Sequence, residues 1–209
     1  MQLEIVTNQS KKQQDTKNLV IEGFLGKLGK SGFSTEELRQ ITNHFWSFPK
    51  NSSRNKQWIM TDESGKLLGT MLLKRENDEA SSLKDYLSLF KQFPKKKILK
   101  LLTIFAILEH DLKENEVYID HIVASKNNRH GGVGTALLEK AQQDILPHEF
   151  LSLYVAASNT RALRLYQRKG FTIVETGNSF IRKKLISEEK WHYMIWRKPS
   201  SLKTRNQKD

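Results

Sequence analysis

The stretch that decides the fold reads EVYIDHIVASKNNRHGGVGTALLEKA and covers residues 116–141. Its first ten residues are rich in β-branched side chains, which predicts a strand. Polar residues end this strand, and three glycines follow within residues 131–134, where the missing Cβ allows a ligand to approach the backbone closely. Apolar residues then recur at helical spacing up to Ala141. The stretch therefore predicts a strand, a glycine turn and a helix.

The glycine turn predicts an anion site. A helix that begins directly after glycines points its unpaired N–H groups and the positive end of its dipole at the space above them, and phosphate is the anion expected there. The turn is not a Walker A loop, because no lysine follows Gly134. It is not a dinucleotide fingerprint either, because Leu137 stands where that motif requires its third glycine.

Two motifs at a suitable distance from each other resemble the GNAT superfamily of acetyl-CoA-dependent N-acetyltransferases. The first, Arg129-x-x-Gly132-x-Gly134, is similar to the family's Gln/Arg-x-x-Gly-x-Gly/Ala motif, which cradles the pyrophosphate of coenzyme A. The second, NTRALRLYQRKGF at residues 159–171, is similar to the family's Asn-x-x-Ala-x-x-Leu-Tyr-x-x-x-Gly-Phe segment. The resemblance covers residues 116 to about 198 well and the first half of the chain in outline.

The resemblance implies an α/β (α+β) protein with the GNAT fold. This fold has a central mixed, mostly antiparallel sheet of about six to seven strands, flanked by helices. The length of 209 residues favours a single domain, which we expect at 1–198, with a polar and disordered tail at 199–209. The residue patterns predict strands at 2–7, 171–176 and 191–196, a hairpin of 57–61 and 66–74, and helices at 15–28 and after a capping box at Ser34 and Glu37.

A helical insertion is expected before the central strand, at about 77–115. It contains two apolar, lysine-rich segments separated by Pro94. Two roles are open for it: it shapes substrate specificity, or it packs on the sheet. We favour packing on the sheet for Leu101, Phe105 and Leu108.

The resemblance also implies where acetyl-CoA binds. The backbone of Ile122, Val123 and Ala124 would pair with the pantetheine arm. Asn159 would hold that arm or a bound water, and Tyr166 would place its hydroxyl near the sulfur as general acid. The pyrophosphate would rest on the loop and helix start formed by Arg129, His130, Gly131, Gly132, Val133, Gly134 and Thr135. Two simpler interpretations stay open: Tyr166 packed beside Leu163 and Phe171, and His130 exposed to solvent.

The general base is expected on the central strand. Strand alternation places Glu116, Tyr118 and Asp120 on one face, so Asp120 and Glu116 are the catalytic candidates. The alternative is that these carboxylates are solvated or structural. Some family members carry a glutamate on the next strand, where this chain has Tyr154. By the same alternation His121 should point to the opposite face and pack under a helix.

Composition restricts the chemistry and the partners. The chain has no cysteine, which excludes disulfides and a cysteine nucleophile, and its six histidines lack metal-ligand spacing, so no metal is expected. No signal peptide or membrane span is recognised, and we expect a cytoplasmic protein. The net charge of +12 attracts anions without choosing among them. Nucleic acid is a disfavoured partner because aromatics do not interleave with Lys95–Lys97, and a homodimer stays open.

The resemblance thus implies an acyltransferase that moves an acetyl group from acetyl-CoA, as cosubstrate, directly to a primary amine in a ternary complex. The acceptor, a small molecule or a peptide, is undetermined. The alternative from another class is a non-catalytic member that binds acyl-CoA as a sensor or interaction module.

Overall fold

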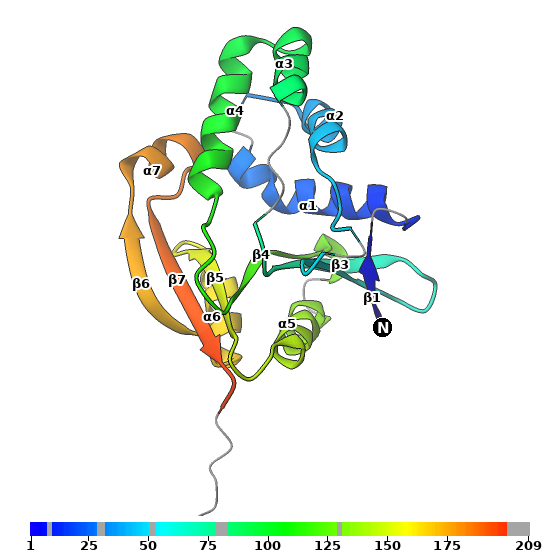
Figure 1. Ribbon diagram of the computed structural model, residues 1–209, viewed down its shortest axis with the longest axis vertical. Helices are drawn as coiled ribbons and strands as arrows, with labels where there is room; N and C mark the ends of the chain where they lie inside the picture. The colour runs from blue at the N-terminus through cyan, green and yellow to red at the C-terminus, as the bar shows by residue number, and fades with distance from the viewer. Residues whose placement is uncertain (8–9, 29–31, 51–52, 78–82, 129–130, 200–209) are drawn as a thin grey trace, which may run out of the picture.

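A seven-stranded sheet forms the centre of the molecule, which we describe from a computed structural model (Figure 1). The structure describes residues 1–7, 10–28, 32–50, 53–77, 83–128 and 131–199, so positions 200–209 of the expected tail lie outside the described residues. The strands are β1 (Gln2–Val6), β2 (Lys56–Thr61), β3 (Leu67–Lys74), β4 (Glu116–Ala124), β5 (Phe150–Ala156), β6 (Thr172–Asn178) and β7 (Lys190–Arg197). The helices are α1 (Gln13–Leu28), α2 (Thr35–Phe45), α3 (Leu83–Gln92), α4 (Lys95–Leu108), α5 (Val133–Asp144), α6 (Thr160–Arg168) and α7 (Phe180–Ile186).

The sheet has the strand order β1-β2-β3-β4-β5-β7-β6. Each neighbouring pair is antiparallel except β4 and β5, which run parallel. The expected mixed, mostly antiparallel sheet is therefore confirmed. The expected strands and helices are present, with bounds that differ by one or two residues at most ends. In the first half of the chain, Ser34 and Glu37 form the capping box that starts α2.

One hydrophobic core lies between the sheet and the helices α5 and α6. Leu137 and Leu138 of α5 and Tyr166 of α6 pack there against inward-facing residues of the strands, such as Val117 and Leu153. Gly69 of β3 permits this packing, since a Cβ at that position would lie 2.4 Å from Cγ1 of Val133. The start of α5 is thus held directly against the sheet.

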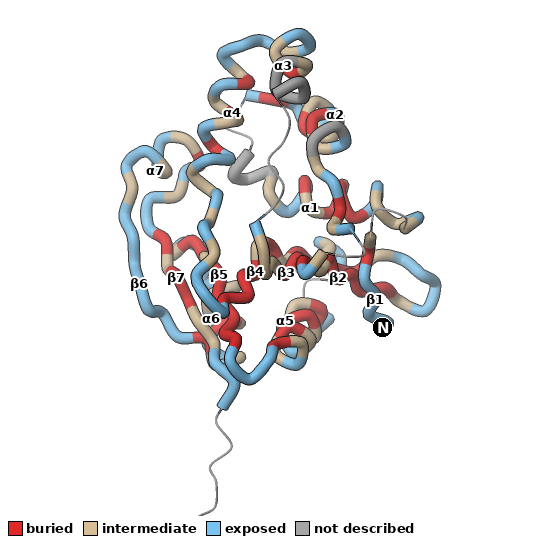
Figure 2. The backbone as a smooth tube through the Cα atoms, in the orientation of Figure 1, coloured by how far each residue is buried: buried red, intermediate tan, exposed pale blue. Residues whose placement is uncertain are grey.

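A second core lies on the other face of the sheet, where α1, α2, α3, α4 and α7 gather (Figures 1 and 2). The predicted insertion supplies α3 and α4. Leu101 is fully buried in this core, which also contains Ala156 and Trp191 from the sheet, and Leu108 lies at its edge. The expected packing on the sheet is wrong for Phe105, which is 44 % exposed. The sequence showed an apolar helix, but it did not show that neighbouring helices would cover most of its apolar face.

No helix in the described part of the chain is long and apolar enough to cross a bilayer.

Candidate functional site

The parallel strands β4 and β5 are joined only at one end. Glu116–Tyr118 pair with Phe150–Ser152, and the described structure has no further ladder pair between the two strands. Beyond Tyr118 the strands diverge, as Figure 1 shows. The remainder of β4 therefore keeps free backbone groups on this side, because hydrogen bonds to β3 use only its other edge. Ile122, Val123 and Ala124 lie along this opening, where the sequence predicts the pantetheine arm.

A β-bulge lies at Asp120. Leu72 of β3 is paired with His121 and Leu73 with Ile119, so Asp120 has no partner on β3. The extra residue reverses the alternation of side chains beyond it. His121 therefore lies on the same face as Tyr118 and Asp120, and all three line one cavity. The expectation that His121 points to the opposite face is wrong, because alternation assumed an unbroken strand.

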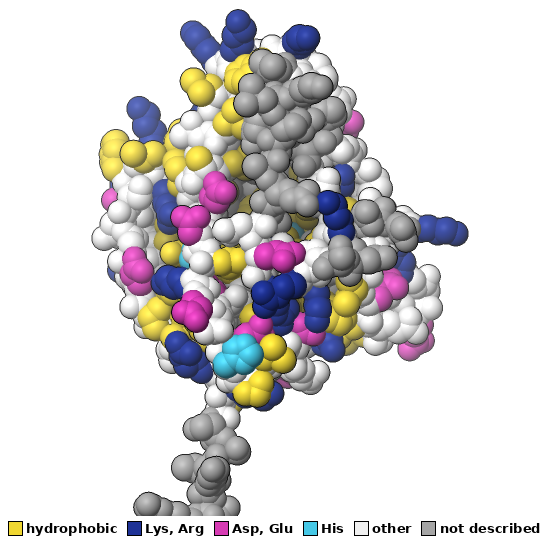
Figure 3. All heavy atoms as spheres, viewed as in Figure 1, with side chains coloured by type: hydrophobic (Ala, Val, Ile, Leu, Met, Phe, Trp, Pro, Cys, Tyr) yellow, Lys and Arg dark blue, Asp and Glu magenta, His cyan; other side chains and the backbone are white. Residues whose placement is uncertain are grey.

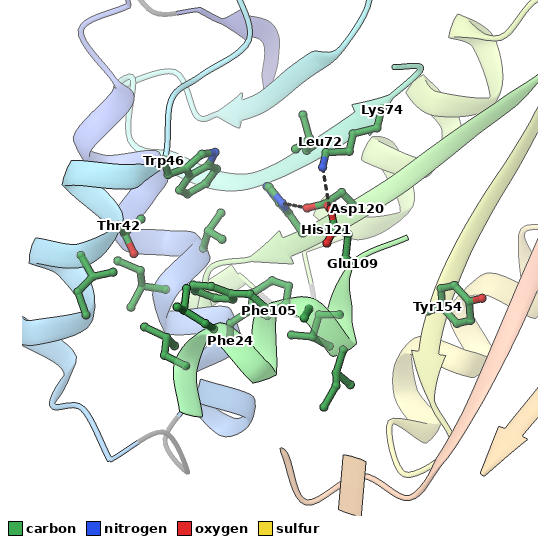
Figure 4. Close-up of a pocket in the computed structure, with 18 of the residues that line it drawn as sticks. Phe24, Thr42, Trp46, Leu72, Lys74, Phe105, Glu109, Asp120, His121 and Tyr154 are labelled. Atoms are coloured by element: carbon green, nitrogen blue, oxygen red, sulfur yellow. Dashed lines mark hydrogen bonds and ion pairs between the residues drawn. The ribbon is translucent and has the colours of Figure 1, made fainter. Parts of the chain in front are cut away.

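Two neighbours hold Asp120 at the cavity wall (Figure 4). Nδ1 of His121 lies 3.0 Å from Oδ2 of Asp120, and Nζ of Lys74 lies 3.6 Å from Oδ1. The Asp120 side chain is 35 % exposed. Burial raises its pKa, but the hydrogen bond from His121 and the charge of Lys74 outweigh this and hold the pKa below its usual range. Asp120 is therefore ionised at neutral pH.

Buried polar residues of β2 and β3 fix His121 from behind. Nε2 of Gln57 lies 3.1 Å from Nε2 of His121 and donates to Oγ1 of Thr70 at 2.6 Å. Thr70 in turn donates to the backbone oxygen of Trp58 at 2.9 Å. In this arrangement Nε2 of His121 accepts, so its Nδ1–H donates to Asp120. This series of hydrogen bonds was not predicted from the sequence, although Gln57 and Thr70 are polar residues within predicted strands.

Glu116 has a different environment at the joined end of β4 and β5. It is buried and accepts hydrogen bonds from Nε2 of His110 at 2.9 Å, the hydroxyl of Tyr193 at 2.6 Å, the backbone N–H of Lys113 at 2.7 Å and the hydroxyl of Ser152. Burial alone would raise its pKa, but these donors lower it to about 2. Glu116 does not line the cavity that Asp120 faces.

Aromatic rings fill the joined end of the two strands. The ring of Tyr154, on β5, lies 6.4 Å from that of Tyr118 and 5.0 Å from that of Tyr193, measured between centroids. His110 packs on Tyr118 at 4.4 Å. At the position where the sequence analysis considers a glutamate, this chain therefore has a tyrosine that packs with other aromatic rings.

The glycine turn and the start of α5 form a backbone donor site. Gly132 precedes the helix with φ of +75°, and the first turn bond of the helix runs from the N–H of Ala136 to the oxygen of Gly132. The N–H groups at positions 133–135 therefore lack acceptors within the helix, as an anion site requires. A Cβ on Gly134 would lie 3.2 Å from Leu165, so α6 packs against this end of α5. Arg129 and His130 lie outside the described residues, and their roles stay predictions.

Tyr166 and Asn159 lie on and before α6. Tyr166 is buried in the first core with its ring centroid 6.0 Å from that of Phe171, and burial raises the pKa of its hydroxyl. The packing of Tyr166 beside Phe171 is thus present, and it leaves the predicted role of the hydroxyl open to test. Asn159 caps α6 by accepting from the N–H of Ala162 at 3.2 Å.

A cavity of about 770 Å³ lies on the face that carries Tyr118, Asp120 and His121. Helices α1 and α4 supply most of its remaining wall, with a smaller part from the end of α2 and Trp46 after it (Figure 4). Within the described part of the chain, no group of three or more histidines and acidic residues is placed to hold a metal ion. The arrangement offers a backbone donor site, an open strand edge and an ionised carboxylate beside a cavity.

Comparison with known proteins identifies relatives. Residues 27–171 match the model of the acetyltransferase (GNAT) family. A search of curated protein sequences found no match. Similar solved structures include an IAA acetyltransferase from Bacillus cereus ATCC 14579, with 12 % identity, a TM-score of 0.52 and coverage of 93 % of this chain and 97 % of that one.

Two further solved structures resemble this chain. A GNAT family acetyltransferase from Elizabethkingia anophelis with acetyl-CoA bound has 12 % identity and a TM-score of 0.53, over 94 % of this chain and 97 % of that one. A mutant of the spermidine N-acetyltransferase SpeG from Vibrio cholerae has 15 % identity and a TM-score of 0.51, over 93 % of this chain and 94 % of that one. At these identities the likeness concerns the fold, and the fold expected from the sequence is confirmed.

Proposed function

The chain belongs to the acetyltransferase (GNAT) family, and on that premise we propose that it moves an acetyl group from acetyl-CoA directly to a primary amine. The observation that carries the proposal is the opening between β4 and β5. It has the backbone donors of α5 near one end, and the bulged Asp120 and its cavity on one face. Such an opening offers an extended thioester a strand edge to pair with and an acceptor a place to meet it.

The first task of these residues is to hold the thioester. The free N–H groups at the start of α5 bind the pyrophosphate, together with Arg129 and His130. The open edge at Ile122, Val123 and Ala124 pairs with the pantetheine arm, and Asn159 contacts it from the other side. A backbone N–H on this edge then donates to the carbonyl oxygen as negative charge develops there.

The second task is to move two protons. The amine nitrogen attacks the carbonyl carbon and the carbon–sulfur bond breaks. Asp120 accepts a hydrogen bond from the ammonium group of the acceptor and takes the proton that must leave before the nitrogen attacks. Because its depressed pKa makes it a weak base, the proton passes on to solvent at the partly exposed carboxylate. Tyr166, kept protonated by burial, donates its proton to the leaving thiolate. The second proton of the nitrogen leaves to solvent as the amide forms, and Tyr166 regains a proton from solvent. Glu116 has all its hydrogen bonds inside the protein, which supports a structural role.

Calorimetric titration with acetyl-CoA and with desulfo-coenzyme A, followed by a thiol-release screen against pooled amines and peptides, tests the proposal. Because the chain has no cysteine, every thiol detected comes from coenzyme A. We expect binding of both compounds and release with at least one pool. Binding without release would favour a non-catalytic acyl-CoA-binding module, and absence of binding would overturn the proposal.

Tyr166→Phe and Asp120→Asn test the residue roles. We expect Tyr166→Phe to lower kcat roughly 10²-fold while acetyl-CoA binding is kept, since only a proton donor is removed. Asp120→Asn should lower kcat/KM by a similar factor. Asp111→Asn, an exposed carboxylate after α4, is the matched control and should change neither value. Unchanged turnover in Tyr166→Phe would exclude its role as the acid.

A further inference from the structure

The cavity beside Asp120 has a predominantly apolar wall. Three of its aromatic side chains come from the helical side: Phe24 on α1, Trp46 directly after α2, and Phe105 on α4. The sheet adds Tyr118, Tyr154 and Trp191. Leucines and isoleucines, most of them on α4, supply much of the remaining apolar surface. Figure 4 shows Phe24 and Phe105 close to each other on one side, with Trp46 and the Asp120–His121 pair across from them. A ligand in this cavity therefore contacts more apolar than polar surface, with charged side chains at Asp120, Lys74, Glu109 and Arg182.

The charged side chains that line the cavity are equal in number of each sign. The lining includes two carboxylates, Asp120 and Glu109, and two cations, Lys74 and Arg182. Lys74 is paired with Asp120, while Arg182 donates to the backbone oxygen of Ile107 at 3.2 Å and stacks over Trp191 at 5.6 Å. An acceptor with several positive charges needs several uncompensated carboxylates, because an ammonium group buried against apolar surface loses its hydration without replacement. This wall does not supply them.

The size of the cavity exceeds what a small polar amine would fill. A volume of about 770 Å³ is in the range of sites that enclose a complete organic ligand. Asp120 provides one place for an amine, and the wall of Phe24, Trp46 and Phe105 provides contact for a bulky body attached to it. Apolar area removed from water there contributes directly to binding of the acceptor.

Resting on the proposed acetyl transfer, we propose that the acceptor is a primary amine with a single positive charge and a bulky apolar or aromatic body. The amine meets Asp120, and the body occupies the cavity walled by Phe24, Trp46 and Phe105. Polyamines are excluded as preferred acceptors. The insertion that forms α3 and α4 thus serves specificity, because α4 carries much of the apolar wall.

Acetylation rates for 2-phenylethylamine, hexylamine, ethanolamine and spermidine test this inference. We expect kcat/KM for the two apolar amines to exceed that for ethanolamine and for spermidine at least about tenfold. A peptide with an N-terminal phenylalanine tells whether the apolar body belongs to a free amine or to a chain end. A rate for the peptide above that of both free apolar amines would show that the preferred acceptor is a chain end and not a free amine. A preference for spermidine would overturn the inference altogether.

Variants on α4 locate the effect. Phe105→Ala should lower kcat/KM for 2-phenylethylamine roughly tenfold and leave that for ethanolamine nearly unchanged, since only the apolar body contacts Phe105. Leu99→Ala, on the same helix and 64 % exposed outside the cavity, is the matched control and should change neither. Ala106→Glu adds a carboxylate to the wall and should raise the rate with spermidine. An equal loss for all amines in Phe105→Ala would contradict the inference.

Direct binding separates this inference from the proposed function. Calorimetric titration of the complex with desulfo-coenzyme A by 2-phenylethylamine measures occupation of the cavity without turnover. Binding that is weakened by Phe105→Ala, in a protein that releases no thiol with any pool of amines or peptides, would sink the proposed transfer and keep the apolar amine site. Turnover of amines without any preference for apolar bodies would keep the transfer and sink the site.

Discussion

Glu116 and Asp120 show how one strand gives two carboxylates different roles. Glu116 is buried among four donors where β4 joins β5, whereas Asp120 is raised by a bulge to the wall of the cavity. Both are ionised at neutral pH, since their hydrogen bonds outweigh the cost of burial. Position on the strand, and not charge alone, therefore decides which of them is available to a ligand.

We expect the ionised Glu116 to stabilise the protein in a pH-dependent way. Its pKa falls from 4.5 to about 2 on folding, so its contribution is complete above pH 4.5 and is lost as the pH falls toward 2. A shift of this size corresponds to about 3 kcal/mol. Glu116→Gln should lower the free energy of unfolding by a similar amount at pH 7, measured by urea denaturation.

The comparison of pH 7 with pH 3 provides the decisive control. The difference in stability between Glu116→Gln and the unchanged protein should shrink at pH 3, because the unfolded chain, in which Glu116 has its ordinary pKa of 4.5, is largely protonated there and is stabilised relative to the folded protein. Glu114→Gln, which changes an exposed neighbour, should have no such effect. A constant difference at both pH values would mean that the side chain acts through packing alone.

At the scale of elements, Gly132 at the start of α5 has two roles: it adopts a positive φ, and it lies at the proposed pyrophosphate site. Gly132 adopts φ of +75°, a region in which a side chain is strained, although the space around it is open. The same residue brings the free N–H groups of the helix to the proposed pyrophosphate site. Conformation and binding can be separated because Gly65, in the turn between β2 and β3, has φ of +81° and equally open surroundings.

Gly132→Ala and Gly65→Ala should each lower the free energy of unfolding by about 1 kcal/mol, from the same backbone strain. Only Gly132→Ala should also weaken acetyl-CoA binding, since its Cβ and any shift of the turn meet the phosphates. Thermal denaturation and calorimetric titration of both variants provide the comparison. Equal affinity in the two variants would move the pyrophosphate site away from this helix.

The elements also mark the limit of prediction from sequence. The glycine turn and α5 were predictable because both depend on local sequence: glycine permits a positive φ, and apolar residues at helical spacing indicate a helix. The side of the sheet on which His121 lies was not predictable. It depends on the bulge, which arises from the pairing of β4 with β3 and cannot be recognised in the residue pattern of β4 alone. The expectation that Phe105 packs on the sheet was wrong for a related reason, since an apolar helix face does not show which element will cover it. The buried Gln57–His121 contact joins residues distant in sequence and could be seen only after folding.

At the scale of the whole molecule, the net charge of +12 should assist binding of an anionic ligand. On the face in Figure 3, Lys and Arg side chains are dispersed among acidic ones and do not form a stripe. This distribution fits a general electrostatic attraction better than a dedicated track for a nucleic-acid backbone. Hydrophobic side chains gather on the same face over α4 and α7, where Leu99, Phe180 and Ile181 are exposed.

We expect the Kd for acetyl-CoA to rise roughly three- to tenfold between about 50 and about 300 mM salt, as its phosphates are screened from the protein. Acetyl-pantetheine, which lacks those charged phosphates, is the control ligand and should bind with an affinity nearly independent of salt. The measurement is calorimetric titration at several ionic strengths. An equal response of both ligands would assign the effect to the protein's own stability.

The incomplete pairing of β4 and β5 also has a consequence for how the molecule unfolds. Three residue pairs at one end are the ladder between the half-sheet β1–β4 and the half-sheet of β5, β7 and β6. A ligand that pairs with the open edge acts as the missing strand between them. Amide protons of β4 that face the opening should then exchange rapidly in the free protein and slowly in the complex. A ligand bound in the opening should therefore make the two half-sheets unfold together, whereas in the free protein they can open separately.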